Sequence, residues 1–182
     1  MPTIRSKPGL RNYYFSLSKE VKAYFHHLPK LSKDFPLDVC LSYAFSQVES
    51  AHNMALYCGA VKIHKVDKGL ARIAVDTFRM ERRPFREKFR AIYGGDLPNQ
   101  LVVVLQAAES VRDDVMHGKS PSADAKRQAI GDVLEYAEGL NTFAYEQAGI
   151  RPFSDLRGFK GAGKSLDGST SRWVLKGMGF AF

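Results

Sequence analysis

The sequence predicts an all-α protein, an up-and-down helical bundle that ends in an irregular, basic, glycine-rich tail. Apolar residues recur at helical spacing over several long stretches, and short joins with glycine or proline separate these stretches. With 182 residues, 45% of them hydrophobic, the chain can bury one sizeable core. We therefore expect a helical bundle over 1–149, with its core at 37–148, and a tail over 150–182 that docks on the bundle.

The first third of the chain predicts short elements. Residues 1–14 show no clear period and contain two prolines and a glycine, which indicates a loose N-terminal arm. A short helix is expected at about 16–27, and a polar connector follows at 30–36. Either Asp34 or Asp38 begins the next helix, because a carboxylate at that position accepts a hydrogen bond from the first helical turn.

A long amphipathic helix is expected to start at Leu37 and to continue past Cys58. Gly59 or Gly69 then bends or ends it. The prediction depends on apolar residues that follow the i, i+3, i+4, i+7 rule, namely Leu41, Ala44, Phe45, Val48, Ala51 and Ala55.

Three more helices follow in the predicted bundle. One carries an apolar stripe at 70–77 and is broken by Pro84, after which a shorter helix runs to Gly94-Gly95. The next starts at Asp96 or Pro98 and carries a stripe of buried residues, Leu101, Val104, Leu105, Ala108, Val111 and Val115.

The last long helix is expected to start at Ser120-Pro121, a strong capping and first-turn pair, and to end near Gly149. Beyond it, the apolar run Trp173-Val174-Leu175 is expected to form a turn or a short strand against the bundle. The segment Gly158–Ser165 matches the phosphate-loop pattern. No buried strand precedes it in the pattern of the sequence, so we interpret it as a flexible basic loop.

The charge balance favours a polyanionic partner. The net charge is +8 at pH 7 and the isoelectric point is about 9.5. Two interpretations are open for the most basic stretch: a solvated helix face with i, i+4 ion pairs, or a track for phosphates with Phe85 and Phe89 interleaved. Its cations are Arg79, Arg82, Arg83, Arg86, Lys88 and Arg90.

The cysteines and the apolar runs predict a soluble, cytoplasmic protein with no membrane contact. Cys40 and Cys58 both lie in helical pattern and do not suggest a disulfide framework. No apolar run reaches the length that spans a bilayer, and the first residues lack the apolar stretch of a signal peptide.

The most reactive set of side chains lies at 111–118, where an apolar helix is expected to end. Arg112, Asp113 and His117 supply a fixed cation, an acceptor and a group that titrates near neutral pH. Five helical steps put Arg112 and His117 about 140° apart on an ideal helix. We therefore expect the end of the helix at Gly118 to swing His117 toward Arg112, next to the free backbone N–H groups of the following helix start.

The segment Arg112-Asp113-Asp114-Val115-Met116-His117 resembles the Arg-polar-x-x-x-His signature of the HEPN superfamily. The resemblance implies a small all-helical bundle that cleaves RNA without a metal or cofactor. It also implies a homodimer in which two protomers place their signatures across a shared cleft. Arg112 and His117 would carry the site and Asp113 would support it, with Lys119 as a further RNA contact.

The chemistry that this resemblance implies is transesterification by the 2′-hydroxyl of the RNA. His117 would act as general acid or base, and Arg112 would hold the phosphate in a bidentate fork. Members of the superfamily act as toxins of toxin–antitoxin pairs or in defence against invading genomes. A cognate antitoxin is therefore an expected partner beside RNA.

Two other functions compete with the nuclease. Some members of the superfamily have no nuclease activity, so a helical module that only binds nucleic acid or protein shares the same fold and charge. A di-iron helical bundle is the third possibility, because Glu49-x-x-His52 and Asp114-x-x-His117 both have the carboxylate-x-x-His spacing that such bundles use.

Overall fold

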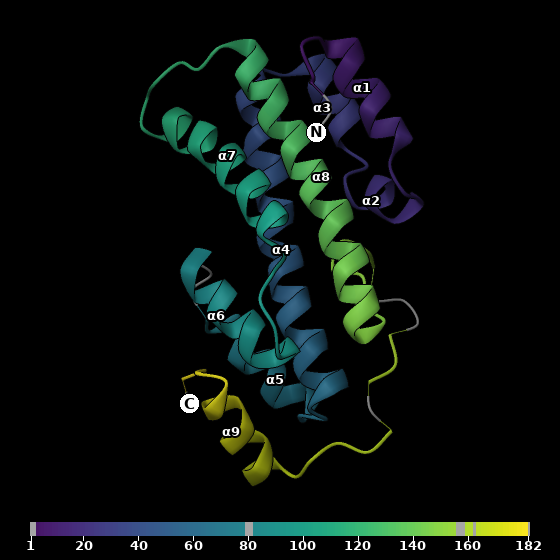
Figure 1. Cartoon of the computed structure of the whole chain (residues 1–182), viewed down its shortest axis with the longest axis vertical. Coiled ribbons are helices and arrows are strands. Elements are labelled where there is room, and N and C mark those ends of the chain that lie inside the picture. The colour runs from purple at the N-terminus through teal and green to yellow at the C-terminus, as the bar shows by residue number, and fades with distance from the viewer. Residues whose placement is uncertain (1–2, 79–81, 156–158, 162, 182) are drawn as a thin grey trace. The chain divides into compact units, whose positions relative to one another are not determined.

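The computed structural model describes residues 3–78, 82–155, 159–161 and 163–181. For Arg82 and Arg83 it describes the backbone but not the side chains. These residues form α-helices joined by loops, with no strand among them (Figure 1). The prediction of an all-α helical bundle is confirmed. The helices are α1 Lys7–Ser16, α2 Lys19–Tyr24, α3 Leu28–Asp34, α4 Leu37–Ile63, α5 Lys68–Asp76, α6 Arg82–Tyr93, α7 Asn99–Met116, α8 Ala123–Ala148 and α9 Gly168–Gly177.

The chain divides into two compact units. The first unit comprises Met1–Val48, Pro98–Asn141 and Phe153–Asp155, and the second comprises Glu49–Leu97, Thr142–Pro152 and Leu156–Phe182. The long helices α4 and α8 contribute residues to both units. The predicted division into a bundle at 1–149 and a docked tail at 150–182 stays a prediction.

Helix α1 lies where the sequence predicts a loose arm at 1–14, and that prediction is wrong. The Ser6 hydroxyl accepts a hydrogen bond from the N–H of Gly9 at 3.1 Å and caps the helix. Pro8 lies in the first turn, where backbone N–H groups have no acceptor within the helix, so the missing N–H of proline costs no hydrogen bond. The proline and glycine that indicated an arm therefore mark a helix start, and Leu10 and Tyr14 bury the inner face.

Residues 30–34 of the connector predicted at 30–36 are also helical, and only Phe35 and Pro36 separate α3 from α4. Pro29 lies in the first turn of α3, and Leu28 is buried at its start. The helix predicted at 16–27 is shorter than expected, because α2 begins only after its cap residue Ser18 and ends at Tyr24. Polarity indicated a loop at 30–36, but α3 needs only one buried position to pack against α1.

The core of the first unit closes around Phe153, after the end of α8. The Asn141 amide of α8 donates to the carbonyl of Phe153 at 3.1 Å and accepts from its N–H at 2.7 Å. Both residues are buried. The ring of Phe153 stacks on Phe25 at 5.7 Å between centroids and meets Tyr24 and Tyr136 edge to face. This side chain thus fixes the path of the chain where it re-enters the unit.

In the second unit, α6 packs against the end of α4. The hydroxyl of Tyr93 donates to the carbonyl of Ala55 at 2.9 Å, and its ring stacks on Phe89 at 4.1 Å between centroids. The predicted end at Gly94 is confirmed, because Gly94 has a φ of 75° just after α6. The predicted break at Pro84 is wrong: α5 already ends at Asp76, and Pro84 lies in the first turn of α6, where proline is tolerated.

Helix α9 replaces the turn or short strand predicted at Trp173-Val174-Leu175, and this is a correction. The Asp167 carboxylate accepts hydrogen bonds from the N–H groups of Ser169 and Thr170, which starts a helix. Helix α9 lies beside α5 (Figure 1), where the N–H of Asp67 donates to the buried Ser171 hydroxyl at 3.0 Å. The three-residue apolar run was too short to show this period.

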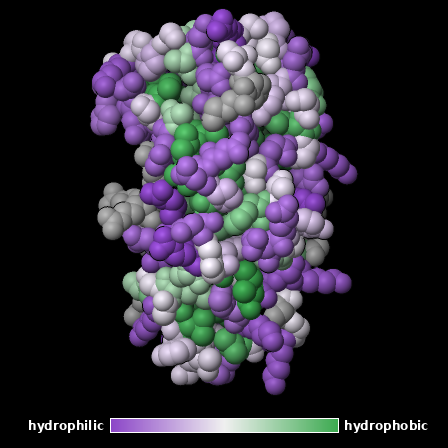
Figure 2. Space-filling model, viewed as in Figure 1, coloured by the Kyte–Doolittle hydropathy of each residue, from purple (hydrophilic) through white to green (hydrophobic). Residues whose placement is uncertain are grey.

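The face of the molecule in Figure 2 is mostly hydrophilic, with smaller hydrophobic patches between the polar side chains. Among the described helices, none combines the length and the apolar character needed to cross a membrane.

Replacing Asn141 with alanine is expected to destabilise the protein by about 2–4 kcal/mol, because the buried N–H and C=O of Phe153 both lose their partner. The free energy of unfolding from urea denaturation measures this loss. Thr142→Ala is the matched control, since Thr142 is the exposed neighbour on the same helix. A loss below about 1 kcal/mol for Asn141→Ala would show that the pair does not hold the segment.

Candidate functional site

Helix α7 carries the candidate residues at its C-terminal end. Of the six apolar side chains that the sequence predicts to be buried, Leu101, Val104, Leu105 and Ala108 are buried, and Val111 and Val115 near the end of the helix are half-buried. The predicted start at Pro98 is also confirmed, since Pro98 is the N-cap residue. The last turn is therefore a fixed part of the first unit, and it presents Arg112, Asp113 and His117 from a rigid helix.

Gly118 ends the helix in a Schellman motif. The N–H of Gly118 donates to the carbonyl of Val115 at 3.1 Å, and the N–H of Lys119 donates to that of Asp114 at 2.8 Å. Gly118 has a φ of 76°, a left-handed conformation that glycine adopts without strain. The position of His117, directly before this glycine, is thus set by the helix end that the sequence predicts.

Arg112 is half-buried and packs against α4. Its guanidinium carbon lies 5.2 Å from the centre of the Phe45 ring, a cation–π contact, and Phe45 is itself only 4% exposed. This contact limits the freedom of the long arginine side chain. The sequence showed Phe45 only as a core residue, because the pairing depends on how α4 and α7 pack within the first unit.

Asp113 and His117 are exposed to solvent. His117 is the C-cap residue, and its N–H still donates to the carbonyl of Asp113 at 2.9 Å, so its Cα lies on the path of the helix, although its own φ of −90° and ψ of 17° are no longer helical. On that path, Arg112 and His117 remain about 140° apart around the axis. The structure brings Arg112 to Phe45, and the predicted swing of His117 toward Arg112 stays a prediction.

Lys119 pairs with Asp114. The two side chains meet at 2.8 Å, and this hydrogen bond to the carboxylate raises the pKa of Lys119. Asp114 is part of the signature and Lys119 follows it closely, so the negative charge of Asp114 is balanced locally by the ammonium of Lys119. Lys119 as a contact of RNA stays a prediction.

The next helix starts later than Ser120-Pro121, which corrects the sequence prediction. Helix α8 begins at Ala123, and the Ser122 hydroxyl caps it by accepting from the N–H of Ala125 at 3.1 Å. Of the two serines, Ser122 has the correct spacing for this bond. The free N–H groups of this helix start lie two residues further from His117 in sequence than expected.

In the basic stretch at 79–90, for which a solvated helix face and a phosphate track were both open, Lys88 and Arg90 contact other groups of the second unit. The Lys88 ammonium lies 5.2 Å and 5.5 Å from the ring centres of Phe78 and Phe180. Arg90 forms two hydrogen bonds with Asp96, which raise the pKa of Arg90. Arg86 is half-buried. Arg79 lies outside the described residues, and so do the side chains of Arg82 and Arg83.

The two aromatic residues interleaved with these cations belong to the core. Phe85 is 2% exposed and Phe89 is fully buried, so neither ring can stack on a nucleobase. The amphipathic period of α6 accounts for both, since they lie four residues apart on its inner face. A phosphate track with stacking phenylalanines is therefore wrong for this helix.

The residues considered for a di-iron centre do not come together. In the described part of the chain, no three His, Cys, Asp or Glu side chains are grouped so that they could hold a metal ion. His52 is 6% exposed and its ring stacks on Phe85 with 3.6 Å between centroids. A neutral imidazole packed on a core ring explains His52 without a metal.

Comparison of this chain with protein-family models, with curated proteins and with solved structures gives no match. The class of protein is therefore defined by the fold alone: an all-α helical bundle.

Stability is expected to fall as the pH drops below the ordinary pKa of histidine, because burial lowers the pKa of His52 to about 3. The unfolded chain binds a proton at this residue below about pH 6.5, whereas the folded protein does not. From pH 7.5 to pH 5.0, wild type should lose about 2 kcal/mol more than His52→Gln. Urea unfolding at the two pH values measures the difference, and equal losses would contradict it.

Proposed function

We propose that this protein is a metal-independent endoribonuclease of the HEPN type. The observation that carries the proposal is the last turn of α7, where the Arg112–His117 signature ends in a rigid Schellman motif. Asp113 and His117 are open to solvent there, and Arg112 is held against Phe45. An arginine, a carboxylate and an imidazole on one helix end are groups that phosphodiester cleavage can use.

In the proposed reaction, the 2′-oxygen of the RNA attacks the adjacent phosphorus and the bond to the 5′-oxygen of the next nucleotide breaks. The His117 imidazole takes the proton of the 2′-hydroxyl, or as imidazolium gives a proton to the leaving 5′-oxygen, and solvent exchanges the other proton. The products are a 2′,3′-cyclic phosphate and a free 5′-hydroxyl. All atoms are accounted for without an added water or metal.

Arg112 would stabilise the extra negative charge that the phosphate gains in the transition state. Its guanidinium can donate two parallel hydrogen bonds to phosphate oxygens. The contact with Phe45 supports this role, since a guanidinium already restricted by packing loses less entropy when it binds. Asp113 would orient one of the two neighbouring side chains, and Lys119 would reduce the repulsion from Asp114.

A homodimer would complete the site. Five helical steps separate Arg112 and His117 by about 140° around the axis, so a regular helix end would not present both from a single face. A two-fold axis near the helix end would place the arginine of one protomer opposite the histidine of its partner. Each such arginine–histidine pair would form one complete site.

The setting that we propose follows from the same resemblance: a toxin of a toxin–antitoxin pair or a defence nuclease, acting on RNA in the cytoplasm, with a cognate antitoxin as a partner. The net charge of +8 supports RNA as the polyanion. These assignments depend on the cleavage activity, and its absence would refute them as well.

A non-catalytic helical module is the second candidate. The half-burial of Arg112 against Phe45 favours it, because such a contact also stabilises α7 on α4 without any chemistry. This module would bind nucleic acid or protein through its basic surface. It differs from the nuclease only in the outcome of a cleavage assay.

Purified protein is expected to cleave mixed RNA in EDTA and to leave cyclic phosphate ends. His117→Ala and Arg112→Ala should each slow cleavage by about 100-fold or more, the range expected for loss of a general acid–base or a charge-stabilising donor. Gel analysis of the RNA and end-group analysis of the fragments measure both results.

Gln106→Ala is the matched control, since this half-buried residue lies on the same helix one and a half turns earlier. Melting curves of every variant show whether the fold is kept. Intact RNA with wild type, or equal cleavage by wild type and both variants, would refute the nuclease and leave the binding module.

A mixture of the inactive Arg112→Ala and His117→Ala proteins is expected to regain cleavage, roughly a quarter of the wild-type rate per protomer. Half of the dimers would be mixed, and each mixed dimer would contain one intact pair of Arg112 and His117. Joint refolding followed by the RNA assay measures this rescue. A mixture as inactive as its components would contradict a site made of one residue from each protomer.

A further inference from the structure

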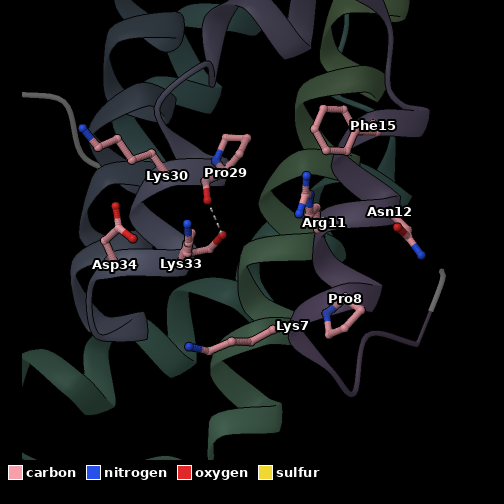
Figure 3. Close-up of a pocket in the computed structure, with 10 residues that line it drawn as sticks. Lys7, Pro8, Arg11, Asn12, Phe15, Pro29, Lys30, Lys33 and Asp34 are labelled. Atoms are coloured by element: carbon pink, nitrogen blue, oxygen red, sulfur yellow. Dashed lines mark hydrogen bonds between the residues drawn. The ribbon is translucent and has the colours of Figure 1, made fainter.

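A basic groove lies between α1 and α3 in the first unit, with a volume of about 970 Å³. Its lining includes the cations Lys7 and Arg11 from α1 and Lys30 and Lys33 from α3. Among the described residues that line it, Asp34 is the only acid. Figure 3 shows Lys7 extending from α1 toward α3, with Arg11 on α1 and Lys33 on α3 beside the space between the two helices.

The four cations of the groove are exposed. Among the described residues, none of them forms an ion pair with a carboxylate, in contrast to Arg90 and Lys119 elsewhere. Lys30 and Asp34 extend to the side of α3 that faces away from α1 in Figure 3. With four cations and Asp34 in its lining, the groove has an excess of positive charge, and Lys7, Arg11 and Lys33 are the cations nearest the space between the two helices in Figure 3.

Phe15 adds an aromatic ring to the same groove. It is 52% exposed, and the Arg11 guanidinium carbon lies 5.6 Å from its centre. Lys7, Arg11 and Phe15 are spaced by four residues, so they form one stripe along α1. Each step along this stripe is about 6 Å. This is close to the separation of neighbouring phosphates in an extended single strand.

These features distinguish the groove from the stretch that the sequence indicated as a phosphate track. On α6, Arg90 is paired with Asp96, Lys88 is half-buried beside two aromatic rings, and Phe85 and Phe89 are buried. On α1 and α3, the cations are unpaired with acids and the phenylalanine is exposed. The second combination is the one used by proteins that bind single strands.

We propose that the groove between α1 and α3 binds single-stranded RNA, with Lys7, Arg11 and Lys33 on successive phosphates and Phe15 stacked on a base. The choice of RNA as the strand rests on the proposed function. Phosphates explain the three cations, and a base explains why an aromatic ring stays exposed beside them. An acidic peptide would use the cations but would leave the ring without a role.

Binding of a labelled single-stranded 2′-O-methyl RNA of roughly a dozen nucleotides tests this proposal, because that strand cannot be cleaved through its 2′-oxygen. Fluorescence anisotropy at several salt concentrations gives the affinity and its salt dependence. Arg11→Gln/Lys33→Gln should bind about tenfold or more weakly, and the slope of log K against log salt should be smaller by about 1.4.

Phe15→Ala separates stacking from charge. It should weaken binding by about fivefold or more and leave the salt slope unchanged, because a ring contributes no phosphate contact. The matched control for charge is Lys164→Gln/Arg172→Gln, which removes two exposed cations outside the groove. This control should bind like wild type. All substituted side chains are exposed, and melting curves verify that the variants fold.

Three results would overturn the proposal: equal weakening by the two double variants, an unchanged affinity of the groove variant, or strong binding of a polyglutamate peptide through the groove while RNA fails to bind. The cleavage assay in EDTA tests the proposed nuclease function independently of this binding experiment. If the groove variants weaken RNA binding but the protein does not cleave RNA, the groove proposal is supported and the nuclease is refuted. If the protein cleaves RNA but the groove variants bind it like wild type, the nuclease is supported and the groove proposal is refuted.

Discussion

The hydrogen bonds between the Asn141 side chain and the backbone of Phe153 are the constraint on which the first unit depends most. The chain leaves this unit after Asn141 and returns at Phe153, and a buried amide fixes the return through one donor and one acceptor. Phe153 then fills the space between Phe25 and Tyr136. Because an unpaired backbone group in this core would be costly, the contact specifies one path for the chain as well as stabilising it.

The candidate site illustrates how much a helix end can determine. Gly118 has the left-handed conformation that closes the Schellman motif, and the sequence alone identified this glycine as the end of the helix. What the sequence did not contain was the environment of Arg112. Its guanidinium lies over Phe45, a residue 67 positions away in the chain whose periodicity indicated only burial. A contact between two helices distant in sequence leaves no local pattern at either residue.

The distribution of charge was the least predictable property. A dense run of arginine and lysine on α6 was the obvious candidate for phosphate binding, yet Lys88 and Arg90 contact groups within their own unit and Phe85 and Phe89 are buried. The cations near the N-terminus are sparser in sequence. They lie together because α1 and α3 pack side by side, and the expectation of a loose arm concealed this. The local density of cations in the sequence therefore does not identify a phosphate-binding surface, because tertiary contacts decide which cations are free to bind phosphates.

The sequence by itself determined the all-α class, the start of α4 at Leu37, the start of α7 after Pro98, and the helix ends at Gly94 and Gly118. Apolar period and the conformational limits of proline and glycine act over a few residues, so they can be recognised without knowledge of the fold. Only the tertiary structure decided that 7–16, 28–34 and 168–177 are helical and which charged groups are neutralised by a neighbour. Short helices gain most of their stability from packing against other elements, and an ion pair or a cation–π contact exists only once two distant segments have met.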